Sequence, residues 1–305
     1  MTRFTTLIRR AFFLEQWKIG WSRQSIGEFL AAPSKTRFQW IEGASTGVLL
    51  ADPFGVEDGE GLFILAERQV HGERRGQIVR FDAHAPARAH TLLDKGWHLS
   101  YPFVVTEEGR RYVVPEQGEA GHLAFYTLDE NLQVQEDPVA VIEDMAVLDA
   151  TFLHHDGYWW LFSSRVDDVR PDENLYLHYS QHLTGPYTPH PANPVVSDIS
   201  RARPAGRVIA SEGRLFRPGQ DCTLGYGTAV NVSEIIEISP TAYVERPFRR
   251  IEPADLDGAF SDGNHQIDHT ANYVLVDSKR FVFCWHAWWL KLRVIVARRR
   301  DRRAN

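Results

Sequence analysis

The sequence predicts an all-β fold, a five-bladed β-propeller in a single domain. A short hairpin phrase recurs along the chain, and a period of about fifty residues is typical of propeller blades. Each copy joins a short opening strand to a second strand rich in aromatic and β-branched residues, across a tight polar turn. No long segment with a helical period interrupts the copies, which favours an all-β over an α/β fold.

The phrase is clearest in the first three copies, where Gly59, Gly109 and Gly157 mark the turns. The paired segments are 51–54 with 62–67, 101–103 with 112–116, and 149–152 with 159–164. A fourth copy has its turn at Gly213. The fifth is predicted to join 269–276 to 280–285 through a turn at 277–279.

These copies define the expected domain plan. Residues 1–48 lack the phrase and are expected to form a lead-in and a blade-closing strand. The blades are placed at about 49–95, 97–140, 141–197, 201–250 and 264–297, and a basic tail follows at 298–305. For the arginine-rich tail, a solvated, frayed segment is favoured over a specific anion or membrane contact.

The composition narrows the class of partner and the compartment. A net charge of −6 and a pI near 6.1 argue against a general nucleic-acid surface. Cys222 and Cys284 are too few for a disulfide framework, and the N-terminus lacks a signal-peptide pattern, so a reducing, cytoplasmic location is expected. The longest aromatic run, 281–290, has about half the length needed to cross a bilayer. No membrane span is therefore expected. No cofactor is expected either, and the sequence has no glycine-rich phosphate loop.

The candidate site follows from the geometry of a propeller, in which the innermost strands line one axial channel. Polar groups at equivalent ends of successive blades therefore converge there. The residues that open the innermost strands are Asp52, Tyr101, Asp149, Arg203 and His269, and those that end the second strands are Glu67, Glu116, Ser164, Gln220 and Trp285. His98 is expected at the rim, and Arg165 and Asp221 adjoin two of these strand ends.

Each of these residues also has an ordinary structural interpretation. Asp52 precedes a proline and could simply start a turn, but its recurrence in register with Asp149 favours a functional role. Arg203 could neutralise an acidic channel, or hold a hydroxyl or an anionic group of a ligand. No three His, Cys or Asp residues show the spacing of a strong metal site, so no metal is expected.

Two of the candidate aspartates and a proline-rich segment resemble parts of known enzymes. The aspartates that open blades one and three, with the proline-rich segment 183–194, resemble the five-bladed propellers of family 43 glycoside hydrolases and their relatives in families 32 and 130. The resemblance implies that Asp52 is a general base and that Asp149 tunes and orients the general acid.

A closer resemblance covers about residues 15 to 295. The chain is similar to the N-terminal propeller of plant glucosamine inositolphosphorylceramide transferases and to bacterial proteins with the same module, some beside a formyltransferase. The matching segments are 51–54, 100–103, 115–116, 149–152, 202–206, 217–222 and 226–227.

One departure from family 43 affects the predicted chemistry. Those enzymes open blade four with a catalytic glutamate, whereas this chain has Arg203 there. Glu116 and Asp221 remain as candidate proton donors, and Glu116 is preferred because the charge of Asp149 would raise its pKa.

Two functions follow for an axial site that takes a glycan or glycoconjugate, including an anionic one. The first is hydrolysis of a glycosidic bond by Asp52, Glu116 and Asp149. The alternative is a sugar-binding or accessory module that works with a glycosyltransferase or formyltransferase. A protein-interaction platform is disfavoured, because such surfaces need exposed apolar anchors rather than clustered charge.

Overall fold

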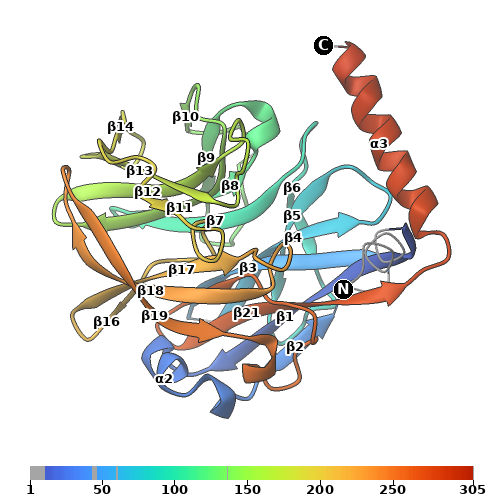
Figure 1. Ribbon diagram of the computed structural model, residues 1–305, viewed down its shortest axis with the longest axis horizontal. Helices are drawn as coiled ribbons and strands as arrows, with labels where there is room; N and C mark the ends of the chain where they lie inside the picture. Colours follow the sequence, from blue (N-terminus) through green and yellow to red (C-terminus); the bar gives the residue numbers. More distant parts are fainter. Residues whose placement is uncertain (1–10, 43–46, 60, 136, 305) are drawn as a thin grey trace.

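The computed structural model describes residues 11–42, 47–59, 61–135 and 137–304. Within these ranges the chain forms five antiparallel sheets arranged as a propeller, which confirms the predicted fold (Figure 1). The first ten residues of the expected lead-in lie outside the described part. Each sheet is one blade, and its strands follow one another outward from the innermost.

Four blades follow the order of the sequence. Blade one consists of β3 (Val48–Asp58), β4 (Gly61–Val70), β5 (Gly76–Asp82) and β6 (His90–Leu93). Blade two consists of β7 (Ser100–Glu107), β8 (Arg110–Glu116), β9 (Leu123–Leu128) and β10 (Ala140–Ile142). Blade three consists of β11 (Val147–His155), β12 (Tyr158–Arg165), β13 (Asn174–Ser180), β14 (Thr188–Pro189) and β15 (Val196–Ser197). Blade four consists of β16 (Ile209–Ser211), β17 (Arg214–Asp221), β18 (Ala229–Ile238) and β19 (Tyr243–Ile251).

The fifth blade joins the two ends of the chain. Its inner strands are β20 (Ile267–His269) and β21 (Tyr273–Phe283), and its outer strands are β1 (Phe13–Arg23) and β2 (Gln39–Glu42). Strand β1 pairs with β21 along its whole length, from Phe13 opposite Phe283 to Arg23 opposite Tyr273. This pairing closes the ring through backbone hydrogen bonds, which leaves neither strand as a free edge.

The predicted layout of blade five is wrong in two respects. Residues 277–279, expected to form a turn, lie in the middle of β21, and the turn falls at 270–272. The polar side chains that suggested a turn are buried and paired: Asp277 accepts from the His265 amide, and Ser278 accepts from the Phe260 amide. The blade also ends at Phe283, because helix α3 (Ala287–Ala304) occupies the residues assigned to its last strand and to the tail.

The remaining helices are short. Helix α2 (Ile26–Ala31) begins with a capping box in which the Ser25 and Glu28 side chains bond each other's backbone amides. Single 3₁₀ turns lie at η1 (Pro33–Lys35), η2 (Gly118–Ala120) and η3 (Pro253–Asp255).

Aromatic side chains from the innermost strands pack across the blade boundaries. Phe54 of β3 contacts Phe103 of β7 with ring centroids 5.3 Å apart, and Phe103 contacts Phe152 of β11 at 5.6 Å. Burying each ring contributes about 1.5–3 kcal/mol. This packing holds the inner strands of blades one to three, and therefore their polar ends, in fixed relative positions.

Candidate functional site

The openings of the first three inner strands share a strained backbone. Asp52, Tyr101 and Asp149 have φ values of 54°, 42° and 52°, and each lies at a β-bulge that shifts the register of its strand pair. Left-handed backbone at a non-glycine residue costs on the order of 1 kcal/mol or more, and it persists where surrounding contacts over-determine it. Each of these three copies of the recurring hairpin sequence therefore forms a β-bulge at the same position.

The amide at each bulge donates to a carboxylate of the preceding blade. Tyr101 N donates to Asp52 Oδ2 at 3.1 Å, and Asp149 N donates to Glu116 Oε2 at 3.1 Å. Asp52 N donates to Asp277 Oδ2 at 3.4 Å, which continues the pattern across the ring closure. These bonds explain how carboxylates come to be buried around the axis, since each compensates part of the desolvation of a charged group.

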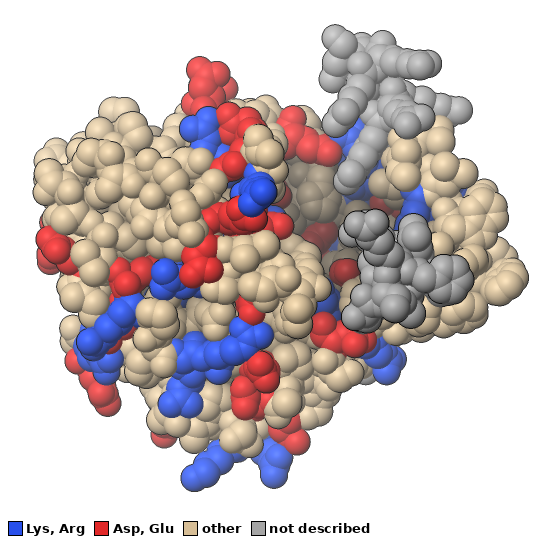
Figure 2. Space-filling model, in the orientation of Figure 1, with Lys and Arg blue, Asp and Glu red and all other residues tan. Residues whose placement is uncertain are grey.

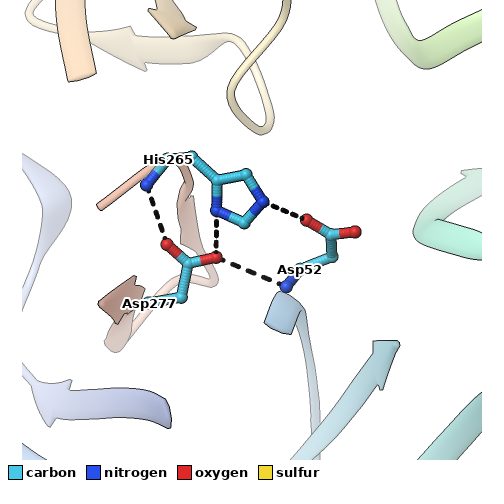
Figure 3. Close-up of side chains that lie close together, drawn as sticks. All are labelled: Asp52, His265 and Asp277. Carbon is cyan, nitrogen blue, oxygen red and sulfur yellow. Dashed lines mark hydrogen bonds and ion pairs between the residues drawn. The ribbon is translucent and has the colours of Figure 1, made fainter. Parts of the chain in front are cut away.

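His265 lies between two of these carboxylates, as Figure 3 shows. Its Nε2 is 3.1 Å from Asp52 Oδ1, and its Nδ1 is 2.6 Å from Asp277 Oδ2. Burial acts to lower the pKa of His265, but the charges of Asp277 and Asp52 outweigh it and raise that pKa to about 10. Burial acts to raise the pKa of Asp52, but the hydrogen bond and charge of His265 hold it below its usual value. The group is therefore an imidazolium between two carboxylates.

Among the residues that the structure describes, these three have ligand atoms close enough to hold a metal ion, all within 4.8 Å of one another. Both ring nitrogens of His265 lie at ion-pair distance from carboxylate oxygens, so the same atoms also form a charge cluster without a metal.

Arg203 forms the second charge centre, on the segment that leads into blade four. Its Nε donates to Asp149 Oδ2 at 2.6 Å and its Nη1 donates to Asp172 Oδ1 at 2.9 Å. Glu116 Oε2 lies 3.9 Å from its Nη2. Gln220 Nε2 also donates to Asp149 Oδ2, at 3.1 Å. Arg203 therefore lies in direct contact with the carboxylates of Asp149 and Asp172.

Two glutamates of the cluster have a raised pKa. Burial, and then the negative charge of Asp149, raise the pKa of Glu116 well above its ordinary value. Burial, and then the charge of Asp52, do the same to the pKa of Glu67. His98 Nε2 lies 3.6 Å from Glu67 Oε1, and the ring is partly exposed, which agrees with a position at the rim. Within the cluster the pKa of Asp52 is therefore lowered while the pKa values of Glu67 and Glu116 are raised.

Tyr226 is the most exposed aromatic ring beside these groups. Its ring centroid is 5.2 Å from that of His265 and 5.1 Å from the guanidinium carbon of Arg203. It stands in the loop between β17 and β18, is 38% exposed, and offers an apolar face next to buried charge. Such a face can pack against a sugar ring.

Four residues predicted for the site have other surroundings. Asp221 pairs with Arg250 and accepts a hydrogen bond from the Thr223 hydroxyl. Burial acts to raise the pKa of Asp221, but these contacts outweigh it and lower that pKa, which argues against Asp221 as a proton donor. Trp285 is 68% exposed and lies beyond the end of β21. Neither residue serves the axial chemistry expected of it.

The other two are His269 and Arg165. The charged neighbours of His269 are Asp268 and Arg207, and Arg165 is exposed and bonds Asp167 at 2.6 Å. Their positions follow from strand direction: His269 ends β20, and the Arg165 side chain leaves β12 toward solvent.

His265, Asp277 and Tyr226 are members of the cluster that the sequence analysis missed. His265 and Tyr226 lie on connections outside the recurring hairpin phrase, and Asp277 was assigned to a turn. The matched segment 226–227 was the available signal for Tyr226.

The fold and the buried carboxylates define a class, the five-bladed propellers with an axial acidic cluster. Solved structures with this fold include an α-L-arabinofuranosidase from Podospora anserina, with a TM-score of 0.56, 14% sequence identity, and coverage of 76% of this chain and 81% of that one. An exo-β-1,3-galactanase from Clostridium thermocellum has a TM-score of 0.53 and 12% identity, over 75% of this chain and 57% of that one. At such identities the likeness concerns the fold alone.

Residues 14–273 match the family described as glucosamine inositolphosphorylceramide transferase 1, N-terminal, and the chain belongs to this family. The transferases of that name from Oryza sativa subsp. indica and Arabidopsis thaliana are each 34% identical, over 226 and 209 residues. The matches cover 72% and 65% of this chain but 30% and 27% of the relatives, so the chain spans less than a third of their length. The suspected family is thereby confirmed.

Proposed function

We propose that the axial cluster binds a glycan and hydrolyses a glycosidic bond, with Asp52 as general base and Glu116 as general acid. The observation that carries this proposal is that two buried carboxyl groups on neighbouring blades have pKa values shifted in opposite directions. The pKa of Asp52 is lowered and that of Glu116 is raised. Environments that push two carboxyl pKa values apart are the usual basis of acid and base assignments in glycosidases.

In this mechanism Asp52 takes a proton from the attacking water while the water oxygen bonds to the anomeric carbon, and Glu116 gives its proton to the leaving oxygen. Burial, and then the negative charge of Asp149, raise the pKa of Glu116, and Arg203 and Gln220 hold Asp149 in place. His265 orients Asp52. Glu67, Tyr101 and His98 supply polar groups for sugar hydroxyls, and Tyr226 supplies a stacking face.

A sugar-binding module is the second candidate, and one observation favours it. The aspartates that would carry the chemistry are each held by a cation, Asp52 by His265 and Asp149 by Arg203. Charge neutralised in this way suits recognition without turnover. In this case the chain would serve a glycosyltransferase, as the names of its relatives suggest, or a formyltransferase. A cytoplasmic location remains a prediction under either function.

The two candidates separate in one experiment with a broad glycan panel. Product formation and binding are measured for the wild type, for Asp52→Asn and for Glu116→Gln, with Asp167→Asn as a control at an exposed ion pair. Hydrolysis predicts that the wild type and the control cleave one glycan class, while Asp52→Asn binds it with turnover reduced by at least about a hundredfold. Binding of a glycan that no form of the protein cleaves would overturn the hydrolase and support the module.

A further inference from the structure

Helix α3 extends away from the propeller at the C-terminal end of the chain (Figure 1). Its first turn is anchored to the body. Ala287 is fully buried, and Lys291 Nζ donates to Phe13 O of β1 at 2.7 Å. The inner side of the helix is therefore fixed, and its outer side faces away from the body.

A stripe of large apolar side chains covers that outer side. Its members are between 41% and 68% exposed. They recur at intervals of three and four residues, which places them on one helical face. Within α3 the stripe consists of Trp288, Trp289, Leu292, Ile295 and Val296, and Trp285 extends it from the segment just before the helix.

The stripe continues onto the end of blade five. Phe283 is 56% exposed, and its ring centroid lies 6.2 Å from that of Trp285. Phe12 stacks on Trp285 with ring centroids 5.8 Å apart. A contiguous apolar surface of this kind marks an interaction site in a folded protein.

Positive charge accompanies the apolar stripe. The helix carries seven lysine or arginine residues and one acidic residue, whereas the whole chain has a net charge of −6. Arg293 lies over the Trp289 ring, with its guanidinium carbon 4.9 Å from the ring centroid. Figure 2 shows basic side chains beside a largely uncharged surface where α3 meets the body.

We propose that α3 docks the propeller onto an anionic lipid surface, with the apolar stripe in the headgroup region and the basic residues against lipid phosphates. Three tryptophans suit this region because an indole ring is apolar yet carries a polar N–H. Basic residues beside an apolar face are typical of interfacial helices. Among the helices of the described residues, none is long and apolar enough to cross a membrane.

An anionic bilayer fits better than an acidic protein partner because large apolar side chains and basic residues occur together in the sequence of one helix. Both features can meet a planar surface at once. The helical form of residues 298–304 also replaces the frayed tail expected from the sequence.

Sedimentation of the full chain with lipid vesicles tests this proposal. The vesicles contain equimolar phosphatidylcholine and phosphatidylglycerol, or phosphatidylcholine alone. The test variant carries Leu292→Ser and Ile295→Ser, and the control carries Val244→Ser and Ile236→Ser. The two pairs match in exposure, at 47% and 48% on α3 and at 47% and 51% on blade four. All four side chains are exposed, so both variants should fold, which circular dichroism checks.

The wild type and the control should bind the anionic vesicles, bind the neutral ones far less, and show a blue shift of tryptophan fluorescence. The α3 variant should bind at least about tenfold more weakly, since two apolar side chains no longer enter the bilayer. Equal binding by the two variants would overturn the proposal, as would absence of binding by the wild type. Light scattering that finds a wild-type dimer and a monomeric α3 variant would overturn it in favour of a second copy.

Discussion

The Nε2 atom of His265 lies 3.1 Å from Oδ1 of Asp52, although the two residues come from opposite ends of the propeller sequence. Because His265 also contacts Asp277, one cation compensates two buried carboxylates. Replacing it with glutamine should destabilise the fold by about 3 kcal/mol or more, since removing one member of a buried ion pair leaves an uncompensated charge. Urea unfolding at neutral pH measures this loss, and His154→Gln, at an exposed histidine, is the control.

The pH dependence of stability separates this charge effect from lost packing. The pKa of His265 is raised from 6.5 to about 10, so the folded protein holds its proton more tightly than the unfolded chain does. Its stabilising effect should be complete below pH 6.5 and disappear as the pH rises through about 10. The difference in unfolding free energy between wild type and His265→Gln should shrink over that range. A constant difference would contradict the charge explanation.

Gly206 should tolerate no side chain. Its φ is 116°, its amide donates to the Tyr101 hydroxyl at 2.8 Å, and a Cβ added there would lie 1.9 Å from the backbone oxygen of Ile267. We expect Gly206→Ala to cost more than about 3 kcal/mol in thermal or urea unfolding, because backbone of the neighbouring blade must move. Gly213→Ala is the matched control: its φ is 72°, nothing lies within 4 Å, and about 1 kcal/mol is expected. Equal losses of stability in the two variants would show that the positive φ alone explains the effect, without the contact to Ile267.

The recurring phrase predicted the inner carboxylates because a local feature produces them. Asp52, Tyr101 and Asp149 each occupy a bulge that the phrase encodes, so register in the sequence becomes register around the axis. Glu116 follows by the same logic from the end of its paired strand. A repeat of known period is therefore enough to bring these residues together around one axis.

Ring closure limited what the sequence could reveal. His265 belongs to a connection between blades, and it meets Asp52 of blade one only when the last blade closes the ring. Trp285 shows the converse limit. The apolar spacing around Trp285 predicted a strand, although the residues that follow form a helix with exposed tryptophans. Apolar spacing alone does not distinguish a short buried strand from the first turns of a helix.

Arg203 should not be replaceable by lysine. Its guanidinium bonds Asp149 and Asp172 through two different nitrogens, and an ammonium group cannot reproduce that fork. Arg203→Lys should destabilise the protein by about 1–3 kcal/mol in urea unfolding and weaken binding of any glycan found for the axial site. Arg165→Lys is the control, since Arg165 pairs with Asp167 at the surface, and it should change stability by less than about 0.5 kcal/mol. Similar effects from both variants would contradict a special role for Arg203.

Acid should destabilise the protein through two partly buried histidines. Burial lowers the pKa of His269 to about 4 despite the charge of Asp268, and burial with the charge of Arg165 lowers that of His178 to about 4. Below pH 6.5 these histidines bind protons in the unfolded chain but stay neutral in the folded protein. Their protonation therefore favours the unfolded state, and the free energy of unfolding falls as the pH drops toward about 4. His269→Gln and His178→Gln should each reduce the fall in unfolding free energy between these pH values, by about 1–2 kcal/mol. The exposed His154→Gln should leave it unchanged, and an equal response in all three variants would show that other groups cause the acid sensitivity.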